Sequence, residues 1–121
     1  MIKHQCSQLQ NFIQRFKDEA PLYTLDLENL MAPYNYGEAL SDFIKFMYDE
    51  ELVTGKYFKI LNEFTKAKSA KSFIYGLNEE DCLLLLTGFI RQDRFSDGFL
   101  AMEVKKGNVE AIIKRLKELV V

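Results

Sequence analysis

The chain has 121 residues, of which 48% are hydrophobic and 28% charged, and its formal net charge is −2. These values are ordinary for a globular protein, so they exclude global disorder and argue against a wholesale nucleic-acid binder. The length is that of one domain, and we expect residues 1–121 to form a single domain with its own core.

The cysteines and the first residues bear on the cellular compartment. Cys6 and Cys82 are far apart, belong to no C-x-x-C pair and fall in helix-like apolar patterns, so we expect buried free thiols. A disulfide or a redox role is the alternative. The first residues lack a signal-peptide pattern, and no apolar run approaches the roughly 20 residues of a membrane span. We therefore expect a cytoplasmic protein with no membrane partner.

Apolar residues spaced three and four apart predict most of the secondary structure. They predict helices over residues 3–18, 36–52 and 56–67, and a shorter helix over 69–76. Pro21 follows the first helix. Tyr36 lies on the predicted buried face of the second helix, and Gly55 marks its stop.

Residues 19–35 are the least regular part of the chain. Tyr23, Leu25 and Leu27 alternate with polar residues, which is typical of a strand. No second strand is evident, so the pattern predicts an extended, partly packed connection. A short helical turn over Leu27–Met31 is an equal alternative.

A central helix is predicted over about residues 79–94. Asn78 is a good N-cap, and the three acidic residues that follow it suit the positive end of a helix dipole. The run Cys82–Leu86 makes this helix apolar nearly all round, which indicates that other helices cover it.

Two further helices are expected at the C-terminal end. Ser96 can cap the first of them, with Phe95 packing on Leu100. Gly107 is a predicted C-cap, and Asn108 is predicted to cap the last helix, which runs to about residue 119. The predicted fold is all-α, a compact bundle of five or six helices around the central helix.

Charge is unevenly distributed. Residues 18–51 carry nine acidic residues and one lysine, a balance of −8, whereas residues 54–77 carry five lysines and one glutamate, a balance of +4. Two solvated faces would explain this. The alternative is head-to-tail self-association, giving a dimer, or an acidic partner bound at the lysines.

No recognisable catalytic motif is present. The single histidine, His4, has no cysteine or carboxylate at metal-ligand spacing, and no glycine-rich phosphate-binding motif occurs. The acidic runs at 49–51 and 79–81 fall at helix ends, where solvated or capping roles are expected; glycosidase-type chemistry is the alternative. We expect no catalytic residue, no metal site and no cofactor.

A polar cluster separates the central helix from the next one. It consists of Arg91, Asp93, Arg94, Asp97 and Gly98. Bidentate arginine–aspartate pairs would fix the angle between the two helices. Alternatively, two guanidinium groups beside a helix N-terminus would bind an anion or a partner, and a base-reading role is a third possibility. Gly98 would occupy the second helical position, where a close backbone approach would explain a glycine.

The same region resembles a known family. Residues 84–101 are similar to the hallmark of small bacterial proteins catalogued as a domain of unknown function, number 6508, whose pattern R-x-D-R-F-x-[DE]-G-x-L-A is matched from Arg91 to Ala101. A weaker resemblance spans residues 34–118. It implies a fold and a bacterial or phage origin, but no activity.

Two departures from that family pattern bear on chemistry. Relatives commonly have histidine where this chain has Phe99, and a tryptophan-containing stretch where it has Tyr57-Phe58. If the family's histidine were catalytic, this chain would lack the activity.

Taken alone, the sequence favours a protein–protein interaction or regulatory module without catalytic activity, acting on an unknown protein partner. Nucleic-acid binding is less favoured. It would use a basic, aromatic face and the predicted helix pair joined at Gly107. The residues of that face are Lys56, Lys59, Lys66, Lys68 and Lys71 with Tyr57, Phe58 and Phe73. A small-anion binder or enzyme centred on Arg91, Asp93 and Arg94 is the third hypothesis.

Overall fold

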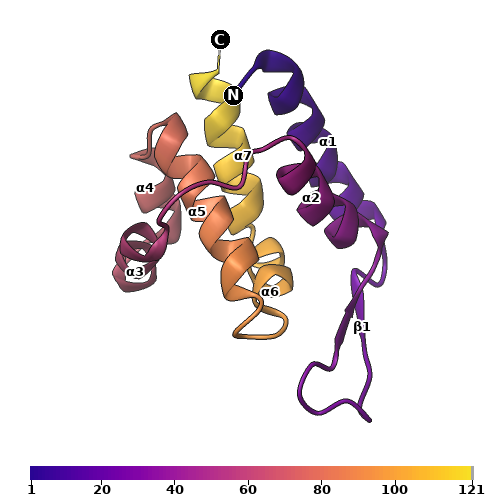
Figure 1. Ribbon diagram of the computed structural model, residues 1–121. Helices are drawn as coiled ribbons and strands as arrows, with labels where there is room; N and C mark the ends of the chain where they lie inside the picture. The colour runs from indigo at the N-terminus through magenta and orange to yellow at the C-terminus, as the bar shows by residue number, and fades with distance from the viewer. Residues whose placement is uncertain (121) are drawn as a thin grey trace.

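The computed structural model describes residues 1–120, which form a helical body and one projecting hairpin (Figure 1). The elements are α1 (Lys3–Asp18), β1 (Tyr23–Leu25), β2 (Tyr34–Tyr36), α2 (Glu38–Asp49), α3 (Phe58–Lys66), α4 (Ala70–Tyr75), α5 (Glu79–Gln92), α6 (Phe99–Lys105) and α7 (Asn108–Leu119). The prediction of a mostly helical, compact fold is confirmed. No helix within residues 1–120 is both long enough and apolar enough to cross a membrane.

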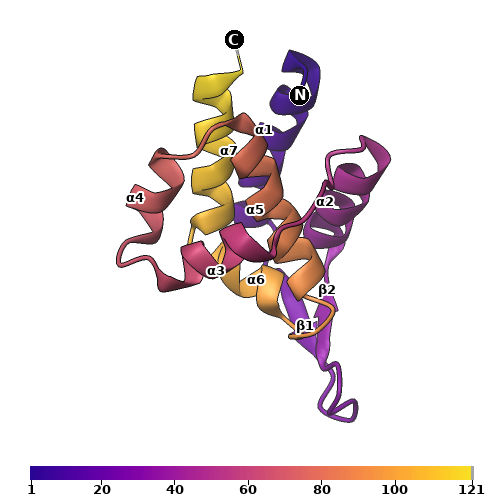
Figure 2. The same cartoon turned by 60° about the vertical axis from the view of Figure 1, so that its left-hand side comes forward.

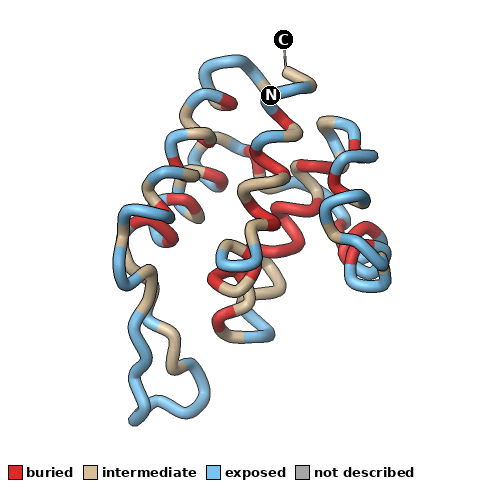
Figure 3. Tube along the Cα trace, turned by 180° about the vertical axis from the view of Figure 1, so that it is seen from behind, coloured by how far each residue is buried: buried red, intermediate tan, exposed pale blue. Residues whose placement is uncertain are grey.

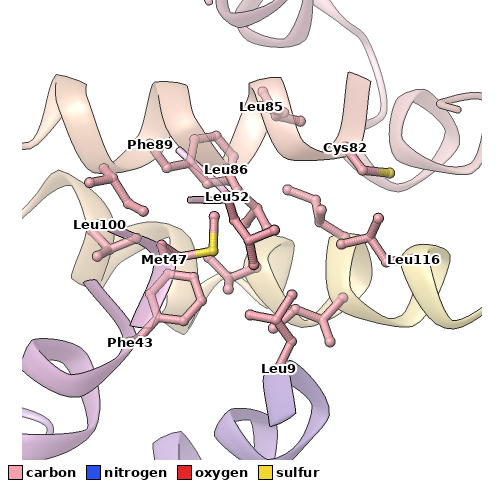
Figure 4. Close-up of a cluster of buried hydrophobic side chains, with 14 of the residues drawn as sticks. Leu9, Phe43, Met47, Leu52, Cys82, Leu85, Leu86, Phe89, Leu100 and Leu116 are labelled. Carbon is pink, nitrogen blue, oxygen red and sulfur yellow. The ribbon is translucent and has the colours of Figure 1, made fainter. Parts of the chain in front are cut away.

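The centre of the body is α5, as its apolar sequence predicted. It packs against α3, α6 and α7, while α3 and α4 lie on one side of it and α1 and α2 on the other (Figure 2). The side chains of Leu85, Leu86 and Phe89 are completely buried. Around them the core gathers side chains from other helices (Figure 4), including Leu9, Phe43, Met47, Leu100 and Leu116.

Side-chain caps define where α4 and α5 begin. The Asn78 side chain accepts a hydrogen bond from the amide of Asp81 at 2.8 Å, which confirms the predicted cap of α5. Ser69 does the same for α4 through the amide of Ser72, at 3.2 Å. The short helix that the sequence suggested over residues 69–76 therefore forms.

The predicted cap of the last helix is wrong by one position. Gly107, at φ 81°, is the N-cap of α7, and Asn108 is its first residue. The Asn108 amide instead donates to the buried carboxylate of Glu103 at 3.1 Å, and the ammonium of Lys106 lies 3.2 Å from the other oxygen of that carboxylate. Glu103 and Asn108 are only 4% and 5% exposed, so their hydrogen bond satisfies two nearly buried polar groups and ties α6 to α7.

The predicted second helix is too long at both ends. Tyr36 belongs to β2, not to the helix, and α2 ends at Asp49, well before Gly55. Glu51 adopts a left-handed conformation at φ 57°, and the next amide, of Leu52, turns back to the carbonyl of Met47 at 2.9 Å. The chain thus closes α2 without using a glycine.

Residues 22–37 form a two-stranded antiparallel hairpin, which we call the arm. The pairs are Tyr23 with Tyr36, Thr24 with Asn35 and Leu25 with Tyr34. The strand-like pattern predicted from Tyr23 is confirmed over Tyr23–Leu25, but the prediction that no second strand pairs with it, and the alternative of a helical turn over 27–31, are wrong. The sequence pattern does not reveal the second strand, because it has only three residues and eight residues separate it from the first.

Both ends of the arm meet at a carboxylate of the body. The side chain of Glu19 accepts a hydrogen bond from the amide of Ala39 at 2.7 Å, at the start of α2. A Cβ atom on Gly37 would collide with Oε1 of that carboxylate, so a larger residue there would displace the Glu19 side chain. The amide of Gly37 also donates to the carbonyl of Leu22 at 3.0 Å, which closes the base of the arm.

Candidate functional site

Two aspartates fasten the arm to the junction between α5 and α6. The backbone amide of Tyr34 donates to the Asp97 carboxylate at 2.8 Å, and the Tyr36 hydroxyl donates to Asp93 Oδ1 at 2.6 Å. The same Oδ1 accepts the amide of Leu100 at 2.9 Å, so Asp93 also satisfies the first turn of α6. We call Asp93, Asp97 and Gly98 the anchor.

Gly98 allows the arm to approach. It is the N-cap of α6, not its second residue, and its φ of 83° is left-handed. A Cβ atom on Gly98 would lie 2.5 Å from the ring of Tyr34. The close approach predicted for this glycine therefore exists, and it comes from the arm.

The predicted capping of α6 by Ser96 and Phe95 is wrong. Ser96 makes no cap, because helix α6 begins three residues later and Asp93 accepts the amide of Leu100 instead. Phe95 does not pack on Leu100, since 78% of it is exposed to solvent.

The arginines of the cluster do not form the predicted pairs. Within residues 1–120, neither Arg91 nor Arg94 forms an ion pair with Asp93 or Asp97. Arg94 instead donates to the exposed hydroxyl of Tyr48 at 3.2 Å. The cluster does connect separate elements, but its aspartates make the connection, and anion binding by the two guanidinium groups stays a prediction.

The environment of Tyr36 keeps its hydroxyl neutral. Burial, and then the hydrogen bond to Asp93, raise the pKa of Tyr36 far above its usual value of 10.0. The hydroxyl therefore remains a donor to Asp93 while its oxygen accepts the amide of Ala101 at 3.3 Å. Asp93 and Tyr36 together join α5, α6 and β2.

Beyond the anchor, the arm ends in an exposed apolar tip, residues 26–33. The exposed fractions are 77% for Leu27, 86% for Leu30 and 91% for Met31. Figure 3 shows almost the whole tip as exposed. Large apolar side chains gathered on a projecting segment are typical of an interaction surface. Sequence reasoning missed them, although three large apolar residues in a segment without helical periodicity were a usable signal.

Hydrogen bonds within the tip give it a defined turn. The Asp26 carboxylate accepts the amide of Glu28 at 3.1 Å, and the Asn29 side chain accepts the amide of Ala32 at 3.2 Å. The amide of Asp26 also donates to the carbonyl of Pro33 at 2.7 Å. These contacts hold the tip without burying its apolar residues.

An apolar groove of about 860 Å³ lies between the base of the arm and the helical body. Its walls come from the end of α1, the strand β1, the end of α6 and the start of α7. The lining residues are Ile13, Phe16, Lys17, Glu19, Ala20, Pro21, Leu22, Tyr23, Thr24, Leu25, Val104, Lys105, Gly107 and Glu110.

The two lysines of this groove differ in whether a carboxylate neutralises them. Lys17 Nζ lies 2.7 Å from Glu110 Oε1, and this contact is the main reason why the pKa of Glu110 is lowered. Lys105 has no carboxylate within ion-pair distance among residues 1–120. Its ammonium lies 4.7 Å from the centre of the Tyr23 ring and donates to the Tyr23 hydroxyl at 3.0 Å. Lys105 thus offers the groove an uncompensated positive charge.

The basic, aromatic face predicted for nucleic acid forms only in part. Its five lysines are exposed, but Tyr57 is buried, so its ring cannot stack on a nucleic-acid base. Phe58 stacks on Tyr57 with ring centres 4.5 Å apart and is 63% exposed. Lys71 is turned toward the start of α7, where it donates to the carbonyl of Gly107 at 2.7 Å.

The remaining chemistry-bearing residues lie apart from one another. Cys6 and Cys82 are buried free thiols, as expected, and burial raises the pKa of Cys82 to about 12. His4 is exposed on α1. Across residues 1–120, no group of three or more histidine, cysteine or acidic side chains lies close enough together to hold a metal ion.

Comparison with known proteins adds the family. The profile of a family of unknown function, DUF6508, matches residues 1–121. The chain belongs to this family. The match is wider than the region 34–118 that the sequence resemblance covered, and it takes in α1 and the first strand of the arm. No match to the chain was found among curated proteins or among solved structures.

Proposed function

We propose that this DUF6508 protein is an interaction module that binds another protein through the arm tip and the adjoining groove, without catalysis. The observation that carries the proposal is the exposure of Leu27, Leu30 and Met31 on a hairpin that projects from the body. Apolar side chains of this size cost free energy in water, and binding a partner would recover it.

The anchor supports this reading of the arm. A flexible loop would lose conformational entropy on binding, which lowers affinity. Here Asp93 and Asp97 hold the base of the arm to the body by hydrogen bonds to Tyr36 and Tyr34. The tip is therefore presented in one orientation before a partner arrives.

The proposed lack of catalysis rests on how the cluster's acids are used. Asp93 Oδ1 already accepts two internal hydrogen bonds, and Asp97 accepts the amide of Tyr34. Groups committed in this way are poorly available for proton transfer to a substrate.

Site-specific photo-cross-linking in the native host tests the proposal. A photoreactive residue at position 30 should give discrete protein adducts. The matched control is position 68, where Lys68 is equally on the surface but lies between α3 and α4. Monomer alone from position 30, or the same adducts from both positions, would contradict binding through the tip.

Nucleic-acid binding is a second candidate, favoured by the exposed ring of Phe58 among the lysines of α3 and its flanks. Retention on a single-stranded DNA column at low salt would support it, provided that the variant Phe58→Ala and the double variant Lys59→Ala, Lys66→Ala are not retained. Passage through such a column at about 50 mM salt without delay would reject it.

A further inference from the structure

We infer that the occupant of the apolar groove is the arm tip of a second copy of this chain, so that two copies exchange their tips. This inference rests on the proposed function, because it names the partner of the same surface. Each copy would give one tip and receive one, as a two-fold symmetric dimer requires.

The groove and the tip match in polarity. The groove leaves Leu22, Leu25 and Val104 at least partly open to solvent, and the tip presents Leu27, Leu30 and Met31. Each surface lacks a cover within residues 1–120. Placing one on the other removes both from water in a single contact.

The charges match as well. Glu28 on the tip is exposed and forms no ion pair among residues 1–120. Lys105 lines the groove and has no carboxylate partner within the same part of the chain. Lys71 donates to the carbonyl of Gly107, which also lines the groove. The four charged residues of the lining, Lys17, Glu19, Lys105 and Glu110, balance one another in number, so the match is local. Glu28 of the tip would pair with Lys105, which favours this partner and orients it.

A copy cannot place its tip in its own groove. Leu22, Tyr23 and Leu25, at the base of the arm, form one wall of the groove, and the tip points away from the body (Figure 1). The anchor holds the arm in that direction through Tyr34 and Tyr36. Only a second molecule can bring a tip to the groove from the opposite direction.

The first test is sedimentation of the purified full chain over a wide concentration range. The wild-type protein should form a dimer, and the variant Leu30→Ser, Met31→Ser should stay monomeric at every concentration. Tyr75→Ser is the matched control, because it removes an exposed large side chain from α4, and it should leave the dimer unchanged.

A charge exchange distinguishes this dimer from any other. Glu28→Lys and Lys105→Glu should each weaken self-association, by about three- to tenfold, because each places like charges between tip and groove. An equimolar mixture of the two variants should associate better than either alone, since each tip then meets a groove of opposite charge.

Two results would overturn the inference. One is a wild-type chain that is monomeric throughout. The other is a dimer that neither the tip variant nor the charge variants weaken. If position 30 still cross-links to proteins of other masses in the host, the proposed interaction function survives and only self-association fails. If position 30 gives no adducts, both fail together.

Discussion

The central helix α5 and the arm contain the same kinds of residue with opposite outcomes. Leu85 and Leu86 of α5 are completely buried, whereas Leu30 and Met31 of the arm are 86% and 91% exposed. Other helices surround α5 on several sides, and nothing in residues 1–120 covers the tip. A leucine contributes to folding only when neighbours remove it from water, so exposed leucines on an ordered arm indicate a use outside the fold.

The largest predicted effect measures this contrast directly. Leu86→Ala should lower the free energy of unfolding by about 2–5 kcal/mol, because it leaves a cavity in the core. Leu30→Ala should change it by less than about 0.5 kcal/mol. Urea unfolding of both variants checks the pair. A large loss from Leu30→Ala would mean that the tip is packed within the monomer.

The next effect concerns the contact between arm and body. Gly98→Ala should lower the free energy of unfolding by about 2–4 kcal/mol, because it adds left-handed backbone strain and a collision with the Tyr34 ring. Gly76→Ala is the control. Gly76 has an ordinary φ, and its nearest obstacle is 3.6 Å away, so urea unfolding should show little change.

A smaller loss is expected from the anchor carboxylate. Asp93→Ala removes the acceptor of both the Tyr36 hydroxyl and the Leu100 amide, and should cost about 1–3 kcal/mol of unfolding free energy. Amide hydrogen exchange should also become faster at residues 34–36. Unchanged exchange there would show that the arm does not depend on the anchor.

The smallest effect is a dependence on pH. The pKa of Tyr36 is raised in the folded protein, so its contribution to stability is fully present below pH 10, the usual tyrosine pKa, and is lost as pH rises above it. The free energy of unfolding, measured in urea between neutral pH and pH 11, should fall as this contribution is lost. In Tyr36→Phe the unfolding free energy should fall less steeply with pH. Tyr75→Phe removes an exposed hydroxyl and should leave the slope as in the wild type. An identical slope in all three proteins would contradict the role of Tyr36.

The helices of the body could be predicted because the residues that determine each of them lie close together in the sequence. The spacing of apolar residues located α1, α3 and α5, and Asn78 marked the start of α5 as a capping residue should. Gly98 was also recognised as a position of close approach. These inferences need only residues within a few turns of one another.

The arm and its anchor could not be predicted in the same way. Tyr34 meets Asp97 across 63 positions of sequence, and Tyr36 meets Asp93 across 57. At the level of sequence, an aspartate beside an arginine suggests a pair between the two, and nothing local signals that a distant hydroxyl takes its place. The groove is still less visible, because four separate elements build it.

The separation of anchor and tip has a consequence for how such chains diverge. Substitutions in residues 26–33 disturb little of the folded body, because these residues are almost all exposed. The stability of the fold therefore does not constrain which residues occur there, and only binding to a partner does. Positions 34 and 36 face 93, 97 and 98, so a change on one side should persist only with a matching change on the other. In a set of relatives, coupled variation should therefore mark the root of the arm, and lineage-specific variation its end.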